Sequence, residues 1–139
     1  MIQSDIKKIV EDLIETFLYA GEISLDLRKK GLTKEIKSDN TPVSNGDLEV
    51  NKILTKRISE LTPNIPIVSE ETSENKSRNN LENFWLIDPI DGTYDYINNL
   101  DEFTINAGLI IQKKPAAGLI YAPAKNRMFY SYGDDLSFE

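Results

Sequence analysis

The stretch Trp85-Leu86-Ile87-Asp88-Pro89-Ile90-Asp91-Gly92-Thr93 decides the fold of this chain. Together with Phe84, its first residues form a continuous apolar run, which is typical of a strand buried on both faces. Its second half predicts a turn, because Pro89 stiffens the exit from the strand and Gly92 permits a tight bend. The stretch therefore predicts a buried strand that delivers two aspartates. Hydrogen bonds of the aspartate side chains in an ordinary turn would explain the same residues without any chemistry.

A second predicted strand, Ile65–Val68, runs into another acidic pair, Glu70 and Glu71. If the two strands are neighbours, up to four carboxylates converge on one edge of a sheet and repel one another. A hard divalent cation would relieve that repulsion. Because the chain contains no histidine and no cysteine, we expect an all-oxygen site for Mg²⁺, Mn²⁺ or Ca²⁺.

The composition excludes several other kinds of chemistry. Without cysteine and histidine there are no disulfides, thiolate nucleophiles, usual zinc sites or Ser-His-Asp triads. The 139 residues include 23 acidic and 16 basic ones, and a net charge of −7 argues against a nucleic-acid partner. No segment approaches the roughly 20 apolar residues of a membrane span, and the charged first twenty residues do not resemble a signal peptide. We therefore expect no membrane insertion and a cytoplasmic location.

The rest of the chain predicts two helices and a series of strands. Apolar residues at helical spacing predict a helix from about Ser4 to Lys29, and Ser44 with Asp47 forms a capping-box pattern that opens a second helix to about Leu61. Three strands of a meander are predicted at Thr104 to Ile111, Ala116 to Tyr121 and Met128 to Tyr132, and a surface loop or short helix at Thr72 to Asn83. The class is α+β, with two long helices packed on a largely antiparallel sheet.

Five segments resemble, in order and spacing, the motifs of the lithium-sensitive, magnesium-dependent inositol monophosphatase superfamily. They are Asp39-Asn40-Thr41-Pro42-Val43-Ser44-Asn45-Gly46-Asp47, Ser69-Glu70-Glu71, the Trp85–Thr93 stretch, Phe103-Thr104-Ile105-Asn106 and Gly118-Leu119-Ile120-Tyr121-Ala122-Pro123-Ala124. The resemblance covers about Asp39 to Tyr132. It implies the N-terminal domain of a layered αβαβα sugar-phosphatase fold and a Mg²⁺-dependent phosphomonoesterase.

Within that superfamily, the chain looks like the 3′(2′),5′-bisphosphate nucleotidase branch. Ser69-Glu70-Glu71, the strand from Glu102 to Asn106 and Tyr121-Ala122-Pro123-Ala124 carry this closer resemblance. The branch removes the 3′-phosphate of adenosine 3′,5′-bisphosphate, a by-product of sulfate assimilation. Tyr94-Asp95-Tyr96 departs from it, since the branch usually has Lys-Glu-Phe there. An inositol or sugar monophosphatase and a non-catalytic remnant of the fold are the alternatives.

The resemblance also implies which residues would bind metal. Glu70, Asp88 and the backbone carbonyl of Ile90 would hold one Mg²⁺, and Asp88 and Asp91 would contribute to a second. The intact family site is expected to hold two or three ions. Glu71 is expected either to support these ligands from behind or to be solvated.

The catalytic residues implied by the resemblance are Asp47, Thr93 and Glu70. Thr93, hydrogen-bonded to Asp47, would orient the water that Glu70 and a metal ion activate, and the Gly92 and Thr93 amides would bind phosphate. The alternative for Asp47 is a purely structural role as a helix-capping residue.

Family members normally have a second α/β domain after the meander. We expect residues 1–139 to form only the N-terminal metal-binding half, because Asp134, Asp135 and Glu139 do not match the distal aspartate of the second metal site. Mg²⁺ binding with weak or absent turnover is expected. The sheet face that would pack on a C-terminal domain should be exposed, which favours self-association or a complementing C-terminal domain as partner.

Overall fold

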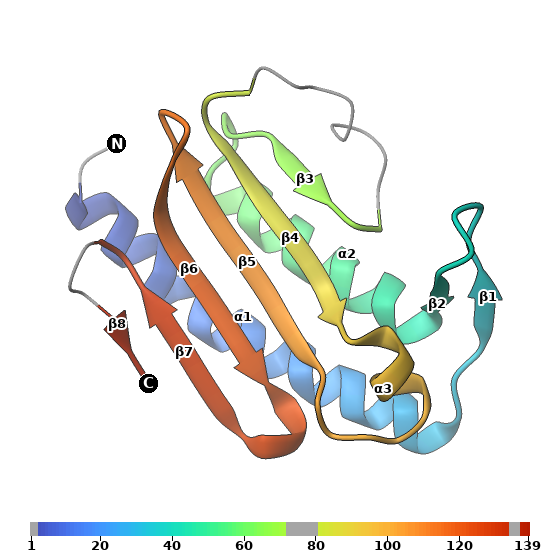
Figure 1. Ribbon diagram of the computed structural model, residues 1–139. Helices are drawn as coiled ribbons and strands as arrows, with labels where there is room; N and C mark the ends of the chain where they lie inside the picture. Colours follow the sequence, from blue (N-terminus) through green and yellow to red (C-terminus); the bar gives the residue numbers. More distant parts are fainter. Residues whose placement is uncertain (1–2, 72–80, 134–136) are drawn as a thin grey trace.

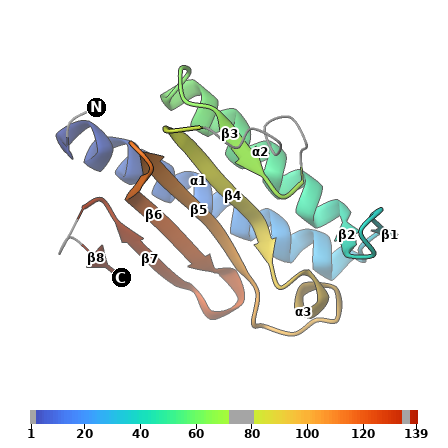
Figure 2. The ribbon, with the colours of Figure 1, turned by 45° about the horizontal axis from the view of Figure 1, so that its top comes forward.

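Two helices lie side by side across one face of a six-stranded sheet (Figures 1 and 2). The computed structural model describes residues 3–71, 81–133 and 137–139. Helix α1 spans Gln3–Lys30 and helix α2 spans Asn45–Leu61. Both helices bury the apolar residues that recur every three or four positions, which is the spacing of one helical face.

The sheet follows the order of the chain, β3-β4-β5-β6-β7-β8. Its strands are β3 (Ile67–Ser69), β4 (Phe84–Asp91), β5 (Thr104–Ile111), β6 (Lys114–Ala122), β7 (Arg127–Ser131) and β8 (Ser137–Phe138). The β3–β4 pair is parallel and the remaining pairs are antiparallel.

Three smaller elements lie between the main helices and strands. A short hairpin of β1 (Lys34–Ile36) and β2 (Pro42–Ser44) precedes α2, and the five-residue helix α3 (Thr93–Ile97) follows β4 directly. A 3₁₀ turn, η1 (Pro123–Lys125), joins β6 to β7. Figure 1 shows α3 and the β1–β2 hairpin near the same end of the sheet, beyond the carboxyl end of β4.

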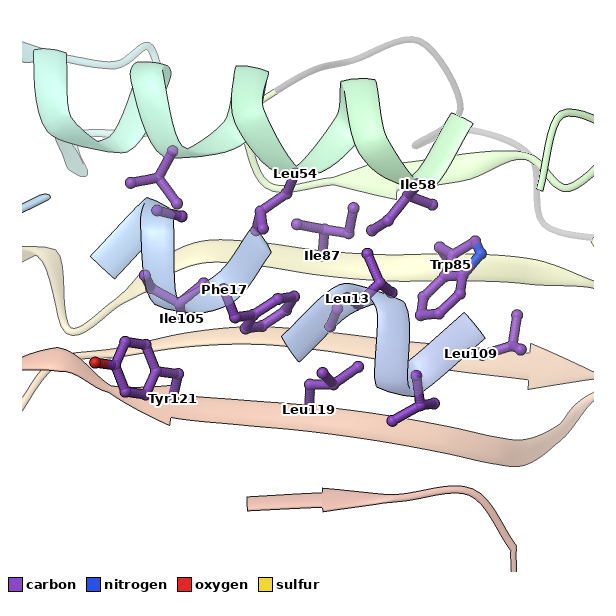
Figure 3. Packing of buried hydrophobic residues seen from close by; sticks show 14 of the residues in the cluster. Leu13, Phe17, Leu54, Ile58, Trp85, Ile87, Ile105, Leu109, Leu119 and Tyr121 are labelled. Atoms are coloured by element: carbon purple, nitrogen blue, oxygen red, sulfur yellow. The ribbon is translucent and has the colours of Figure 1, made fainter. Parts of the chain in front are cut away.

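The core fills the space between the two helices and the sheet. Figure 3 shows side chains of both helices meeting side chains of the strands, and the labelled ones are Leu13, Phe17, Leu54, Ile58, Trp85, Ile87, Ile105, Leu109, Leu119 and Tyr121. The indole Nε1 of Trp85 donates a hydrogen bond to Thr62 Oγ1 at 3.1 Å, so the one polar atom of this buried ring is satisfied at the end of α2.

The α+β class is confirmed, and the predicted helices and meander strands lie within one or two residues of the observed ones. The prediction that β4 is buried on both faces is wrong, because Leu86 is 48% exposed while its neighbours Trp85 and Ile87 are buried. The helices cover only the face to which Trp85 and Ile87 point. The β1–β2 hairpin and β8 were not predicted, and most of the loop predicted at Thr72 to Asn83 lies outside the described residues.

Candidate metal and phosphate site

Parallel pairing of β3 and β4 brings two acidic segments together. Ser69 lies opposite Ile87, and the backbone N–H of Glu70 donates to the carbonyl of Ile87 at 3.1 Å. Glu70 therefore leaves β3 beside Asp88 as that residue continues β4. The sequence predicted this meeting only on the condition that the two strands are neighbours, and they are.

A bulge in β4 governs how its two aspartates face. Asp88 pairs with Asn106 and Asp91 with Thr104, so three steps along β4 match two steps along β5. Because successive side chains of a strand alternate between faces, the extra residue lets Asp88 and Asp91 point toward the same side. Gly92 follows with a φ of +90°, a left-handed conformation that favours glycine, and starts α3.

The electrostatics of Asp88 reflect this crowding. Burial is the largest cause that raises the pKa of Asp88 from its usual value near 3.8 to about 7, followed in order of influence by the carboxylates of Asp91, Glu70, Glu71 and Asp47. Without a cation, the carboxyl group is therefore only partly ionised near neutral pH. A positive charge placed here would favour its ionised form.

Asp47 lies fully buried in the first turn of α2 and accepts three hydrogen bonds. The backbone N–H and hydroxyl of Ser44 donate to its Oδ2 at 2.9 and 2.5 Å, and the hydroxyl of Thr93 donates to its Oδ1 at 2.8 Å. The capping box predicted from the sequence is confirmed. The capping role and the bond to Thr93 are both present, because each uses a different oxygen of the same carboxylate.

Glu71 is neither solvated nor free to join the other carboxylates. Its side chain is 5% exposed and forms an ion pair with Lys37, with 3.6 Å between Nζ and Oε1. Lys37 was not predicted, because nothing local in the sequence links the loop after β1 to the end of β3.

The hydroxyl of Ser69 donates to Oδ1 of the buried Asn51. A signal for Asn51 existed: it lies four residues after Asp47, on the same face of α2.

Asn106 completes the polar surroundings of β4. Its Nδ2 donates to Asp91 Oδ2 at 3.4 Å, whereas its buried Oδ1 has no hydrogen-bond partner among the described residues. Because Asn106 pairs directly with Asp88, this orphaned oxygen lies beside the candidate ligands. An unsatisfied oxygen next to carboxylates suits a hard cation or its bound water.

The carboxylates that meet at this edge do not by themselves form a complete metal-binding group. Within residues 3–71, 81–133 and 137–139, no three acidic side chains come close enough together to hold a metal ion by themselves. Glu71 pairs with Lys37, and Asp91 accepts a hydrogen bond from Asn106. The set that fits Mg²⁺ is smaller: Glu70, Asp88 and the Ile90 carbonyl, all oxygen donors.

A groove of about 640 Å³ adjoins these ligands on the face of the sheet that the helices leave open. Glu70, Asp88 and Asn106 line its acidic end, and Leu86 and Ile120 lie along its apolar part. Both of these apolar side chains are nearly half exposed. The open face predicted from the sequence is therefore present.

Among the described residues, no helix has the length and apolar character that a bilayer span needs.

The fold and this edge of the sheet define a class: α+β proteins with a candidate site for a hard cation next to a buried aspartate that is hydrogen-bonded to a threonine. The chain belongs to the inositol monophosphatase family, whose sequence profile matches residues 5–135. Members of this family are phosphomonoesterases, and the resemblance seen in the sequence is confirmed.

Among curated proteins, a 3′(2′),5′-bisphosphate nucleotidase CysQ of Aggregatibacter actinomycetemcomitans is 37% identical over 125 residues, which are 88% of this chain and 46% of that protein. Among solved structures, the extragenic suppressor protein suhB of Bartonella henselae matches with a TM-score of 0.84 and 22% identity over 94% of this chain and 51% of that one. An IMPase/NADP phosphatase complexed with Mg²⁺ and phosphate matches with a TM-score of 0.80 and 18% identity, over 98% and 51% of the two chains. The chain spans about half the length of the curated relatives it matches.

Proposed function

We propose that this chain supplies the metal-binding half of a Mg²⁺-dependent phosphomonoesterase that acts on a small phosphorylated molecule. The hydrogen bond from the Thr93 hydroxyl to the buried Asp47 carboxylate carries the proposal. It joins the first turn of α3 to the first turn of α2, beside the end of β4 that bears Asp88 and Asp91. Neither helix needs this bond for its own formation.

The ligands proposed for one Mg²⁺ are Glu70, Asp88 and the Ile90 carbonyl, and Asp88 and Asp91 would contribute to a second ion. Bound Mg²⁺ would lower the pKa of a water molecule and neutralise charge on the phosphoryl oxygens. The family relative solved with Mg²⁺ and phosphate supports this choice of cation. The raised pKa of Asp88 supports it as well, because a carboxyl group crowded by others gains most from a nearby positive charge.

The proposed chemistry rests on three groups of this chain. Because the Thr93 hydroxyl donates its proton to Asp47, its oxygen is left to accept a hydrogen bond from the attacking water and to orient that water. Glu70 would accept a proton from the same water. The backbone amides of Gly92 and Thr93 would donate to the phosphate oxygens and stabilise their developing charge.

The proposed substrate is adenosine 3′,5′-bisphosphate, with hydrolysis at its 3′-phosphate. The support is the 37% identity to a CysQ nucleotidase over most of this chain. The groove beside Asp88 has an acidic end and a long apolar wall, which suits a phosphate bound through cations and a flat organic group next to it. Inositol phosphate is the comparison substrate.

The test separates metal binding from turnover. The purified chain is titrated with Mg²⁺ in a calorimeter, next to Asp88→Asn and to Glu35→Gln, an exposed carboxylate on β1 that serves as control. We expect the wild type and Glu35→Gln to bind Mg²⁺ alike and Asp88→Asn to lose binding. An unchanged affinity in Asp88→Asn would contradict the proposed ligand set.

Turnover is measured with the chain alone and with the chain fused to the unmatched half of the Aggregatibacter relative. Phosphate release is followed from adenosine 3′,5′-bisphosphate and from inositol phosphate. We expect weak or absent release from the chain alone and Mg²⁺-dependent release from the fusion, with the bisphosphate preferred. Robust release by the chain alone would refute the need for a second half. Mg²⁺ binding with no release from a folded fusion would favour a non-catalytic remnant.

A further inference from the structure

Tyr96 is a fully buried tyrosine that the proposed function leaves without a role. It lies on α3, one helical turn after Thr93, and its hydroxyl donates to the backbone carbonyl of Ser24 on α1 at 2.7 Å. Burial, with a smaller contribution from Asp47, raises the pKa of Tyr96 above its usual value, so the hydroxyl keeps its proton and remains a donor. A side chain of α3 is thereby hydrogen-bonded to the C-terminal part of α1.

The ring of Tyr96 also touches the first turn of α2. A methyl group on Gly46 would overlap with the hydroxyl oxygen of Tyr96 and lie 2.6 Å from its ring carbon Cε2. The glycine is therefore required here for close approach. Gly46 is the residue before Asp47, and Tyr96 follows Thr93 by one turn. Two contacts thus join the same two helical turns: the packed Tyr96–Gly46 contact and the Thr93–Asp47 hydrogen bond.

Arg28 holds the loop that follows α3. Its guanidinium donates to the carbonyl of Leu100 at 2.7 Å and to Asp101 Oδ1 at 3.3 Å. The same group lies 5.0 Å from the ring centroid of Phe103 and 5.7 Å from that of Tyr96. The arginine side chain is only 11% exposed, although its partner Asp101 is 62% exposed, so the guanidinium is shielded mainly on the side of the two rings.

We propose that Tyr96, Gly46 and Arg28 position the Thr93–Asp47 pair, so that α1 sets the geometry of a site to which it contributes no ligand. Ser24 and Arg28 lie four residues apart on α1, and each forms a hydrogen bond with the segment 92–103. Thr93 also donates to the Ile90 carbonyl at 3.2 Å, so a shift of α3 would move a proposed metal ligand as well. These are positioning residues, and the inference rests on the proposed function.

The test uses two glycines that pack against tyrosine rings. Gly46→Ala pushes on Tyr96. Gly21→Ala is the matched control, because its methyl group would overlap with the ring of Tyr121 on β6 and not with Tyr96. Each variant is measured for thermal unfolding, for the NMR signals of Thr93 in the metal-free chain and for Mg²⁺ affinity.

We expect both variants to lower the melting temperature, and only Gly46→Ala to shift the Thr93 signals. Gly46→Ala should also weaken Mg²⁺ binding roughly 10-fold or more, which is the usual effect of mutating residues that support metal ligands. Adding Tyr96→Phe to Gly46→Ala should recover part of both changes, because it removes the hydroxyl oxygen nearest to the added methyl group. The recovery should be incomplete, because the hydrogen bond to Ser24 is lost as well. Unmoved Thr93 signals in Gly46→Ala would overturn the proposal and leave Tyr96 as core packing.

If Gly46→Ala does not fold, Arg28→Lys tests the positioning proposal instead. The lysine keeps the charge but cannot span the Leu100 carbonyl and Asp101 while stacking on Phe103. We expect shifted Thr93 signals in Arg28→Lys and none in Arg57→Lys, whose side chain forms an exposed pair with Glu60. Unshifted signals in Arg28→Lys would overturn the proposal. A wild type that binds no Mg²⁺ would refute the proposed function, while the Thr93 signals would still decide whether these residues position the Thr93–Asp47 pair.

Discussion

The apolar layer under the sheet and the carboxylate edge of the same sheet act on stability in opposite directions. In the layer, Leu13 and Phe17 of α1 have no exposed surface and pack against side chains of the sheet and of α2. At the edge, the pKa of Asp88 is raised to about 7, so its ionisation near neutral pH costs free energy. The first region serves folding, and the second carries a cost that a bound cation would offset. Such a cost is common at functional sites.

The largest change is expected in the layer. Phe17→Ala should lower the free energy of unfolding by about 3–5 kcal/mol, because it removes buried ring surface and leaves a cavity. Urea unfolding followed by circular dichroism measures this loss. Tyr19→Ala on the same helix is the control, since Tyr19 is 54% exposed and should cost far less. Equal losses in the two variants would mean that α1 is not seated on the sheet as described.

Next in size is the cap that joins the two regions. Ser44→Ala removes the hydroxyl that bonds to Asp47 and should cost about 0.5–2 kcal/mol in urea unfolding. Thr55→Ala, in the middle of α2, is the control and should be nearly neutral because alanine is the stronger helix former. A neutral Ser44→Ala would show that the backbone N–H of residue 44 and the Thr93 hydroxyl are enough to hold Asp47.

Local patterns explain what the sequence could predict of this fold. The capping box at Ser44 and Asp47 lies within four residues, and the strand at Thr104–Ile111 is bounded by its own turn residues. Their physics is complete within a short segment. The acidic pair after β3 and the one at the carboxyl end of β4 could also be found this way, because parallel strands place their carboxyl ends at one edge.

What the sequence could not predict depends on partners far along the chain. The ion pair of Lys37 and Glu71 joins residues 34 positions apart, and the exposure of Leu86 depends on which face of β4 is covered. The bulge that turns Asp88 and Asp91 to one side appears only when β4 is aligned with β5. The roles of Glu70, Asp88, Asp91 and Thr93 remain predictions.

Substitution of Asp88 at the carboxylate edge should change stability less than Phe17→Ala or Ser44→Ala, and it should raise stability where they lower it. Between pH 4 and about 7 the folded state holds a proton on Asp88 that the unfolded state has lost, so stability falls as pH rises through this range. Asp88→Asn removes this cost. We expect the variant to have a higher melting temperature than the wild type at pH 8 without metal, and no advantage near pH 3.5. Partial exposure to solvent keeps the gain below the cost of losing the Ser44 cap.

Glu35→Gln provides the control for charge alone, because Glu35 is exposed on β1. It should leave the melting temperature unchanged at both pH values. Excess Mg²⁺ should raise the melting temperature of the wild type and of Glu35→Gln, but not that of Asp88→Asn. A lower melting temperature for Asp88→Asn at pH 8 would mean that the ionised carboxylate stabilises the fold.

The smallest effect is expected on the open face of β4. Leu86→Thr should change the free energy of unfolding by no more than about 0.5 kcal/mol, because this side chain is already half exposed. Ile87→Thr, one residue later on the covered face, should cost much more. Sedimentation at several protein concentrations adds a second measurement: if copies of the chain associate through this face, Leu86→Thr should reduce their association while Tyr19→Ala does not.

Trp85 gives this chain an optical probe of one particular junction. It is the only tryptophan in the sequence, and it lies fully buried where β4 begins and hydrogen-bonds to the end of α2. Its fluorescence should be that of an apolar environment and shift to longer wavelength when this junction opens. Because Asp88 lies three residues further along the strand, on the side where β4 ends, fluorescence and the Thr93 signals would show whether the two ends of β4 loosen together or one before the other.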